Sequence, residues 1–237
     1  MSNGVVKTLK PAAARPIVAE RLAPLHQPSA PLRNKIIAAL RAAIETGVLA
    51  PGQRLIEKDL CEQLAVSRTS LREALRELQA EGILEYSSSR GLAVAAVSIE
   101  DAKNIYRLRG VLEALAVEQF IEQADDAAVA ELVRESERLK KAYRGGVLED
   151  ILVAKRAFYD HICSGAKNPI AFDMINRLVL RTSSLRNCSL LRKERHQQSI
   201  KEIGRLIEAI QRRDIPRARE TAIEHVNNSA ISALQPR

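Results

Sequence analysis

The sequence is poor in aromatic side chains and in cysteine. Aromatic residues make up only 3% of its 237 residues and tryptophan is absent, although 46% of the residues are hydrophobic. A core built from Leu, Ile, Val and Ala suits packed helices better than a sandwich or barrel of strands. The three cysteines, Cys61, Cys163 and Cys188, are odd in number and widely spaced. This pattern argues against a disulfide framework and against a zinc site, and it favours a reducing compartment.

Long apolar runs are also missing. No run approaches the roughly 20 residues that a membrane-spanning helix needs, and residues 1–16 contain no signal-peptide core. These absences predict a cytoplasmic protein that does not bind membranes. The formal net charge is +8, and a basic balance favours polyanionic partners such as nucleic acid.

The spacing of apolar residues divides the chain into three parts. Residues 1–30 contain four prolines and no periodic pattern, which predicts a flexible N-terminal tail. Residues 31–97 contain three short helical patterns and then two apolar runs joined by a Ser/Gly turn, which predicts a β-hairpin. Residues 98–237 follow helical spacing throughout. We therefore predict a mostly α protein, with an N-terminal winged helix-turn-helix and a C-terminal all-α helical bundle.

Breaks in the pattern set the expected limits of the C-terminal helices. The predicted helices are 101–122, 126–144, 149–166, 169–187, 193–212 and 215–233. Ser98 and Asp125 stand just before two of them, where short polar side chains cap free backbone N–H groups. The run 192–195 is interpreted as a solvated face.

The most informative motif is a pair of short helices joined by a tight turn. The second helix begins after Ser67, a good capping residue, and opens with Arg68 and Thr69. A recognition helix enters the major groove of DNA with its N-terminal end, where free N–H groups and the helix dipole attract phosphate. Arg72 lies four residues after Arg68, so both side chains share one face. The pattern predicts binding to double-stranded DNA.

The tip of the hairpin supports the same prediction. Arg90 and Gly91 join a cation to a residue that allows close backbone approach, which suits the minor groove. Each arginine alone fits equally well a generic three-helix unit with solvated side chains. The order of three helices and a hairpin makes that alternative improbable.

A longer pattern with fixed spacing runs through residues 32–97. Its positions are Ile44, Gly47, Leu49, Pro51, Gly52, Leu55, Glu57, Leu60, Ser67, Arg68, Thr69, Arg72, Glu73, Ala74, Leu75, Leu78, Glu81, Gly82, Arg90, Gly91 and Val94. This stretch resembles the DNA-binding domain of the GntR family, FadR-like branch. The resemblance implies DNA contacts from Lys58, Ser67, Arg68, Thr69, Arg72, Arg90 and Gly91.

The C-terminal part is similar to the helical ligand-binding domain of the same family, the FCD type. The matching residues are Arg109, Glu113, Phe158, Asn168, Pro169, Ala209, Ile210, Asp214, Ala218 and His225. Many members of that subfamily hold a divalent metal with an Asp, a His four residues later, and one His on each of the last two helices. This sequence has Lys155, Tyr159, Ile203 and His225 at those positions. Three of the four ligands are absent and an ammonium group repels a cation, so we predict no metal cofactor of the usual kind.

In the metal-bearing relatives, the metal often helps to bind a carboxylate effector. Because the metal ligands are absent here, other groups must bind the effector. Lys155 and Arg109 can supply positive charge and Tyr159 a hydroxyl. We therefore predict an effector pocket for a small organic acid at Arg109, Lys155, Tyr159, Ile203 and His225. In the alternative, Lys155 points to solvent and Arg109 pairs with Glu113.

The resemblance implies a homodimeric regulator that presents two winged helices to operator DNA. Repression relieved by a metabolite is the commoner family behaviour, and activation is the alternative. No catalytic triad, phosphate loop or paired catalytic carboxylate stands out, so the protein is not expected to be an enzyme. Two further interpretations stay open: a constitutive DNA-binding dimer without an effector, and a regulator that responds to acyl-CoA.

Overall fold

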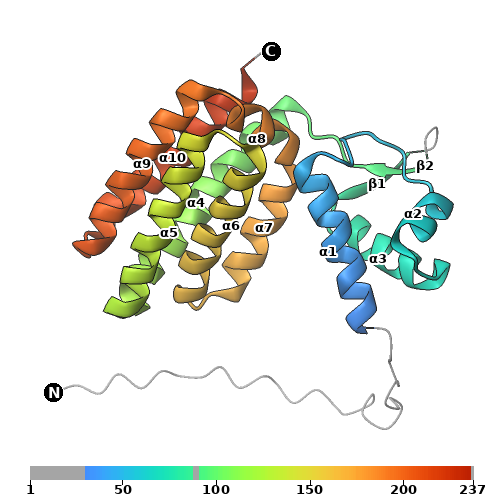
Figure 1. Cartoon of the computed structure of the whole chain (residues 1–237), viewed down its shortest axis with the longest axis horizontal. Coiled ribbons are helices and arrows are strands. Elements are labelled where there is room, and N and C mark those ends of the chain that lie inside the picture. Colours follow the sequence, from blue (N-terminus) through green and yellow to red (C-terminus); the bar gives the residue numbers. More distant parts are fainter. Residues whose placement is uncertain (1–29, 88–90, 236–237) are drawn as a thin grey trace, which may run out of the picture.

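The computed structural model describes residues 30–87 and 91–235, which form two units lying side by side (Figure 1). The predicted tail of residues 1–30 lies outside the described residues except for Ala30, where the first helix begins. The elements are α1 (Ala30–Thr46), α2 (Glu57–Leu64), α3 (Arg68–Ala80), β1 (Leu84–Ser87), β2 (Gly91–Val94), α4 (Ile99–Gln123), α5 (Asp126–Gly145), α6 (Leu148–Gly165), α7 (Pro169–Arg181), α8 (Ser183–Leu190), α9 (Lys193–Gln211) and α10 (Ile215–Leu234).

The first unit is a winged helix made of α1, α2, α3 and the β1–β2 hairpin. Ala65 adopts a left-handed conformation, with φ 52°, and makes the tight turn between α2 and α3. The strands pair antiparallel, with Leu84 opposite Val94. One face of α3 is fully buried through Leu71, Ala74, Leu75 and Leu78, which leaves the other face of this helix to solvent. The predicted winged helix is confirmed.

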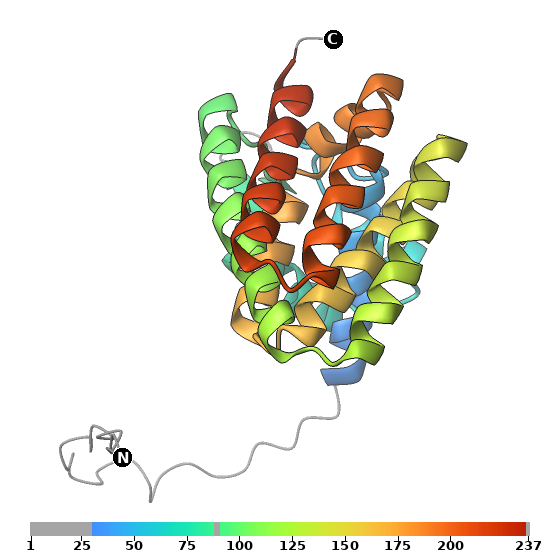
Figure 2. The same ribbon diagram turned by 90° about the vertical axis from the view of Figure 1, so that its left-hand side faces the viewer.

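The second unit is a bundle of α4 to α10, in which α4 lies against α10 (Figure 2) and α5 contacts both α6 and α9. Its core is mainly aliphatic and includes the fully buried aromatic side chains of Phe120, Phe158 and Tyr143. The predicted caps are confirmed, because Ser98 accepts a hydrogen bond from the Asp101 backbone N–H and Asp125 accepts one from that of Ala128. The all-α bundle is therefore also confirmed.

The expected helix 169–187 is wrong in one respect, because it is two helices. It breaks at Thr182, where φ is −104° and ψ is 14°. The Thr182 hydroxyl donates to the carbonyl oxygens of Leu178 and Val179, at 3.1 and 3.4 Å. Such bonding back to the helix competes with the next helical turn. The break lets α8 turn toward α1 and the polar centre of the bundle.

Leu180 joins the two units. It belongs to α7, yet it is buried in the hydrophobic cluster of the winged helix, with α1 residues such as Ile36 and Leu40.

None of the helices in the described ranges combines the length and apolar character that crossing a membrane requires.

Candidate functional site

The exposed face of α3 and the start of α2 carry the residues predicted to contact DNA. Ser67 is the N-cap of α3, and its hydroxyl oxygen accepts from the Ser70 backbone N–H at 3.2 Å. Arg68, Thr69 and Arg72 follow on the exposed side of the helix, and Lys58 is exposed on α2. Local sequence explains this placement, because the apolar residues of α3 fall on the opposite face.

Arg72 is held in place before any DNA binds. Its Nε donates to Glu57 Oε2 at 2.8 Å, across the turn between α2 and α3. Exposed ion pairs of this kind contribute little to stability. The pair therefore directs the guanidinium at small cost and leaves it free to exchange a carboxylate for a phosphate.

The wing supplies one further predicted contact within the described residues. Gly91 begins β2 with φ +73°, a conformation that residues with a Cβ rarely adopt. Arg90, which was predicted beside it, lies outside the described residues. The hairpin itself is placed by the pairing of β1 with β2.

The second site is a cluster of buried charges at the centre of the bundle. Arg109, Lys155, Arg186 and Arg195 are each less than a tenth exposed. They come from α4, α6, α8 and α9, so four separate helices point cations at one region. Burying cations costs free energy unless they are paired and hydrogen-bonded. The structure meets this requirement only in part.

Two of these cations have carboxylate partners within the bundle. Arg109 donates through Nε and Nη2 to Glu113 Oε1, at 3.0 and 2.9 Å. Arg195 Nη2 donates to Glu202 Oε2 at 2.8 Å. In both arginines the other terminal nitrogen, Nη1, is buried and has no hydrogen-bond partner. A buried donor without a partner is costly. Each of these guanidinium groups can therefore still donate a hydrogen bond to a ligand.

Lys155 is the least compensated of the four cations. Its Nζ lies 3.4 Å from His225 Nε2, and no ion pair to it is found in the described part of the chain. Burial, reinforced by the charge of Arg109, lowers the pKa of Lys155 from 10.5 to about 7. The ammonium group is therefore only partly protonated near neutral pH. An anion bound beside it would restore the proton.

His225 and Glu202 contact each other, and His225 lies next to Lys155. His225 Nδ1 lies 2.6 Å from Glu202 Oε2. Burial and the nearby Lys155 lower the pKa of His225 to about 4, so the ring is neutral. Burial alone would raise the pKa of Glu202, but hydrogen bonds from His225 and Arg195 outweigh it and hold the pKa at about 2. The neutral ring then donates through Nδ1 and presents the lone pair of Nε2 to Lys155.

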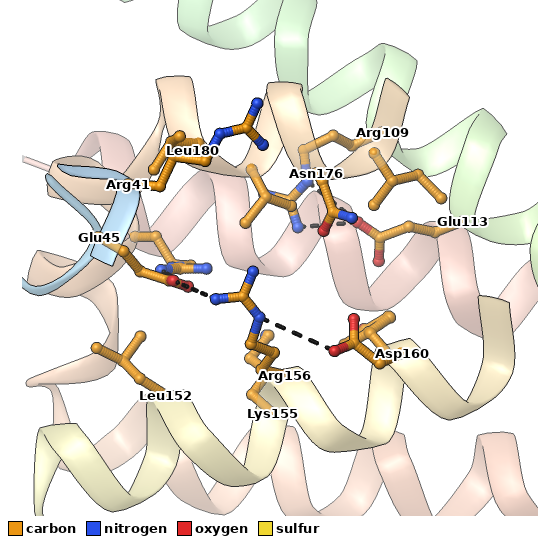
Figure 3. A pocket seen from close by; sticks show the side chains of 14 residues that line it. Arg41, Glu45, Arg109, Glu113, Leu152, Lys155, Arg156, Asp160, Asn176 and Leu180 are labelled. Carbon is orange, nitrogen blue, oxygen red and sulfur yellow. Dashed lines mark hydrogen bonds and ion pairs between the residues drawn. The ribbon is translucent and has the colours of Figure 1, made fainter. Parts of the chain in front are cut away.

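Two cavities meet at these cations. The inner cavity lies within the bundle and is lined by Tyr106, Arg109, Tyr143, Lys155, Arg186, Arg195, Ser199 and Ser229, among others. The outer cavity lies at the boundary with the winged helix and contains about 690 Å³ of free space, including its open mouth. Its wall includes Arg109, Glu113, Lys155, Tyr159 and Arg186 together with apolar side chains (Figure 3). Three residues, Arg109, Lys155 and Arg186, line both cavities.

The structure brings together four of the five predicted effector residues. Arg109 and Lys155 line both cavities, Tyr159 lines the outer one, and His225 contacts Lys155 from behind. Ile203 instead packs into the hydrophobic core with 3% of its surface exposed, and it lines neither cavity. Two questions that the sequence left open are answered by the structure. Lys155 faces inward rather than toward solvent, and Arg109 pairs with Glu113.

The four positions at which the family resemblance implies metal ligands do not suit a divalent cation here. An ammonium group, a phenol and an aliphatic side chain replace three ligands, and Lys155 Nζ points at the remaining imidazole nitrogen. In the described ranges no three His, Cys, Asp or Glu side chains are grouped so that they could hold a metal ion. His161 and His196 bond to the backbone oxygens of Ala128 and Leu190.

Sequence reasoning missed three charged residues of this site. Arg195 was expected on a solvated face, but it is only 4% exposed and bonds to Glu202. Glu202 and Arg186 were not singled out at all. The apolar spacing of α9 contained one signal, because Arg195, Ser199, Glu202 and Leu206 recur every three or four residues and so share its inner face.

A winged helix with exposed cations on its recognition helix, joined to a helical bundle with a charged interior, defines a two-domain DNA-binding transcriptional regulator. Residues 32–94 match the model of the bacterial regulatory proteins of the gntR family, and residues 104–228 match the FCD domain. The chain therefore belongs to the GntR family and carries an FCD domain. Regulators of this family bind operator DNA and bind an effector through the FCD domain.

Known regulators with related sequences support this assignment. The chain is 34% identical to the HTH-type transcriptional regulator McbR of Escherichia coli over 142 residues, which cover 60% of this chain and 64% of McbR. The solved structure of E. coli McbR superposes with a TM-score of 0.75 and 29% identity, over 85% of this chain and 96% of that one. The HTH-type transcriptional repressor RspR of E. coli is 22% identical over 210 residues, covering 89% of this chain and 92% of RspR.

Proposed function

We propose that this regulator responds to an organic carboxylate that binds at Arg109, Lys155 and Arg186. The observation that supports this most strongly is the uncompensated Lys155 beside two buried arginine nitrogens without partners, Arg109 Nη1 and Arg186 Nε. A carboxylate can accept hydrogen bonds from an ammonium and a guanidinium at once. Its charge would balance a group that folding leaves without an ion pair.

We further propose that the winged helix, residues 31–97, reads the operator and that residues 98–237 bind the effector and dimerise. Exposed apolar side chains support the dimer. Leu108 and Val111 lie one turn apart on α4 with 56% and 64% of their surface exposed, and Ile231 on the adjoining α10 is 62% exposed. Val111→Glu is expected to yield a monomer in sedimentation velocity, and a dimer unchanged by this substitution would contradict the proposed interface.

The related protein RspR is named as a transcriptional repressor, and we propose that this protein also represses, in its ligand-free state, and that the carboxylate releases it from DNA. Arg68 and Arg72 would read base edges in the major groove, with Lys58, Ser67 and Thr69 on phosphates. The Gly91 backbone and Arg90 would approach the minor groove. A ligand regulates only if it favours one arrangement of the two domains over the other.

Thermal stability in the presence of hexanoate, succinate, benzoate and octanoyl-CoA tests the effector site. A ligand that binds only the folded protein raises its melting temperature. We expect a carboxylate to stabilise the wild type, to lose this effect in Lys155→Met, and to keep it in Lys201→Met, which removes an exposed lysine. Affinity should also fall as the pH rises above about 7, because Lys155 loses its proton there.

Other outcomes separate the alternatives. Stabilisation by octanoyl-CoA alone would favour an acyl-CoA regulator. No stabilisation by any compound would favour a constitutive DNA-binding dimer.

A further inference from the structure

The last turn of α1, in the DNA-binding unit, inserts a carboxylate into the charged wall of the helical bundle. Glu45 Oε1 accepts from Arg186 Nη2 at 3.0 Å, and Glu45 Oε2 accepts from Arg156 Nη1 at 3.0 Å (Figure 3). The side chain of Glu45 is only 17% exposed and that of Arg186 only 9%. This ion pair is therefore shielded from solvent, and it links residues that are 141 positions apart.

Backbone contacts fix the same turn of α1. The Asn187 side-chain amide donates to the Glu45 carbonyl oxygen at 2.8 Å, and the Ser183 hydroxyl donates to that of Ile44 at 3.4 Å. The last carbonyl groups of a helix lack partners within the helix, and here α8 supplies them. Side chains of one short helix, α8, thus hold the last turn of α1 against the bundle.

The same arginine serves the effector site. Arg186 lines both the inner and the outer cavity, beside Lys155 and Arg109, while Glu45 lines the outer cavity from the other domain. Burial lowers the pKa of Arg186, and the carboxylate of Glu45 opposes this shift. Glu45 is therefore the counter-charge that Arg186 has in the ligand-free protein.

We infer that Glu45 is a tethered competitor of the effector, and that a carboxylate with an apolar body releases α1 by taking Arg186 from it. The inference rests on the proposed effector site and adds how that site acts on the DNA-binding unit. The ligand carboxylate would occupy the shared wall of Arg109, Lys155 and Arg186. Its apolar body would lie against Leu152, Ile175 and Val179, which line the outer cavity.

Physical reasons favour exchange over simultaneous binding. Two carboxylates close to one guanidinium in a shielded site repel each other, so each makes the other weaker. A tethered group has a high effective concentration, and only a ligand with several additional contacts can displace it. Lys155, Arg109 and the apolar wall supply those contacts to the ligand and not to Glu45.

Binding of hexanoate and 1-hexanol, measured by calorimetry on the full chain, tests the inference. Glu45→Gln keeps the size of the side chain but removes its charge. We expect it to bind hexanoate more tightly than the wild type by about five- to 150-fold, the range of typical coupling between sites. 1-Hexanol has the same apolar body without the charge, and its binding should not change.

Glu149→Gln is the matched control, because Glu149 is an exposed carboxylate on α6. It should bind hexanoate like the wild type. Glu45→Asp, which withdraws the carboxylate by one methylene, should give an intermediate affinity and protects the test if Glu45→Gln folds poorly. Hydrogen exchange of the α1 and α8 backbone should rise in Glu45→Gln without ligand, and in the wild type on adding hexanoate.

Each result has a distinct meaning. Equal hexanoate affinity of the wild type and Glu45→Gln would overturn the competition and leave the proposed effector site standing. No binding of hexanoate to either protein would overturn both. Binding to Glu45→Gln alone would support the inference, since it would show that Glu45 excludes the ligand.

Discussion

Two groups of cations in this chain have opposite surroundings. Lys58, Arg68 and Arg72 are exposed on the winged helix, whereas Arg109 and Lys155 are buried in the bundle. Exposed cations keep their hydration and cost little, and they suit a polyanion that slides and exchanges. Buried cations lose hydration, so they are stable only near compensating charge. The difference supports our proposal that one site recognises a charged surface and the other a single charged group.

The largest expected contrast between the two sites is their response to salt. DNA affinity should fall by about a thousandfold between about 50 and about 200 mM salt, if the exposed cations of a dimer release about six counterions. Hexanoate affinity should change by less than about threefold, because buried charges are screened much less. Fluorescence anisotropy with a DNA fragment selected from a genomic pool, and calorimetry with hexanoate, measure the two. Equal salt slopes would refute the distinction.

Removing the buried ammonium group should stabilise the ligand-free protein. Its pKa is depressed to about 7 in the folded state, so the unfolded chain binds more protons between there and the ordinary lysine range. Wild-type stability should therefore rise through this window, while the full cost of the buried charge is present below it. Lys155→Met should raise the free energy of unfolding by on the order of 4 kcal/mol at about pH 6.

Urea unfolding at about pH 6 and about pH 10 checks this prediction. The advantage of Lys155→Met should shrink at the higher pH, and the exposed control Lys201→Met should show no change at either. An advantage independent of pH would mean that lost packing strain, rather than charge, explains the effect.

Removing one exposed cation should weaken DNA binding without changing the stability of the fold. Arg68→Ala is expected to weaken binding of the selected fragment by about five- to 150-fold, the usual cost of losing a base contact. Stability should not change, because the side chain is exposed and forms no ion pair with another described residue. Lys141→Ala, an exposed lysine on α5 of the bundle, is the control in the same anisotropy titration. An equal loss in both variants would indicate a general charge effect.

The smallest expected effect separates capping from DNA contact. Ser67 and Ser98 each accept a hydrogen bond from a backbone N–H of the helix that follows, at 3.2 and 3.0 Å. Replacing either with Ala should lower the free energy of unfolding by about 1 kcal/mol. Only Ser67→Ala should also weaken DNA binding. If both variants bind DNA like the wild type, Ser67 is a cap alone.

The features that could be predicted from the sequence are those that depend on residues close together in the chain. Ser67, Ser98 and Asp125 cap helices as expected, because a cap depends on residues within one turn. The burial of one face of α3 follows from its apolar spacing in the same way. The GntR assignment rested on such local, fixed spacings, which explains why the winged helix was the more predictable half.

The centre of the bundle was less predictable because its contacts are distant along the chain. Arg195 resembled a solvated residue within its charged run, but α9 packs against α5 and α10, and Arg195 bonds to the His225 carbonyl oxygen and the Ser229 hydroxyl of α10. Glu45 gave no signal either, since its partner Arg186 is reached only after α7 breaks at Thr182. Ile203 was placed by alignment of a lost ligand, but its aliphatic side chain belongs in the core.

Leu180 gives the junction between the domains a mechanical property of its own. Its contacts with the winged-helix core are apolar, so an exchange of anions at Glu45 does not weaken them. Leu180 can therefore act as a pivot, about which the winged helix turns without separating from the bundle. When the winged helix rotates about Leu180, the displacement of an atom grows with its distance from Leu180. In the proposed dimer, a shift too small to disturb the core near Leu180 would then be amplified at the tips of the two recognition helices, whose spacing decides whether both half-sites can be occupied together.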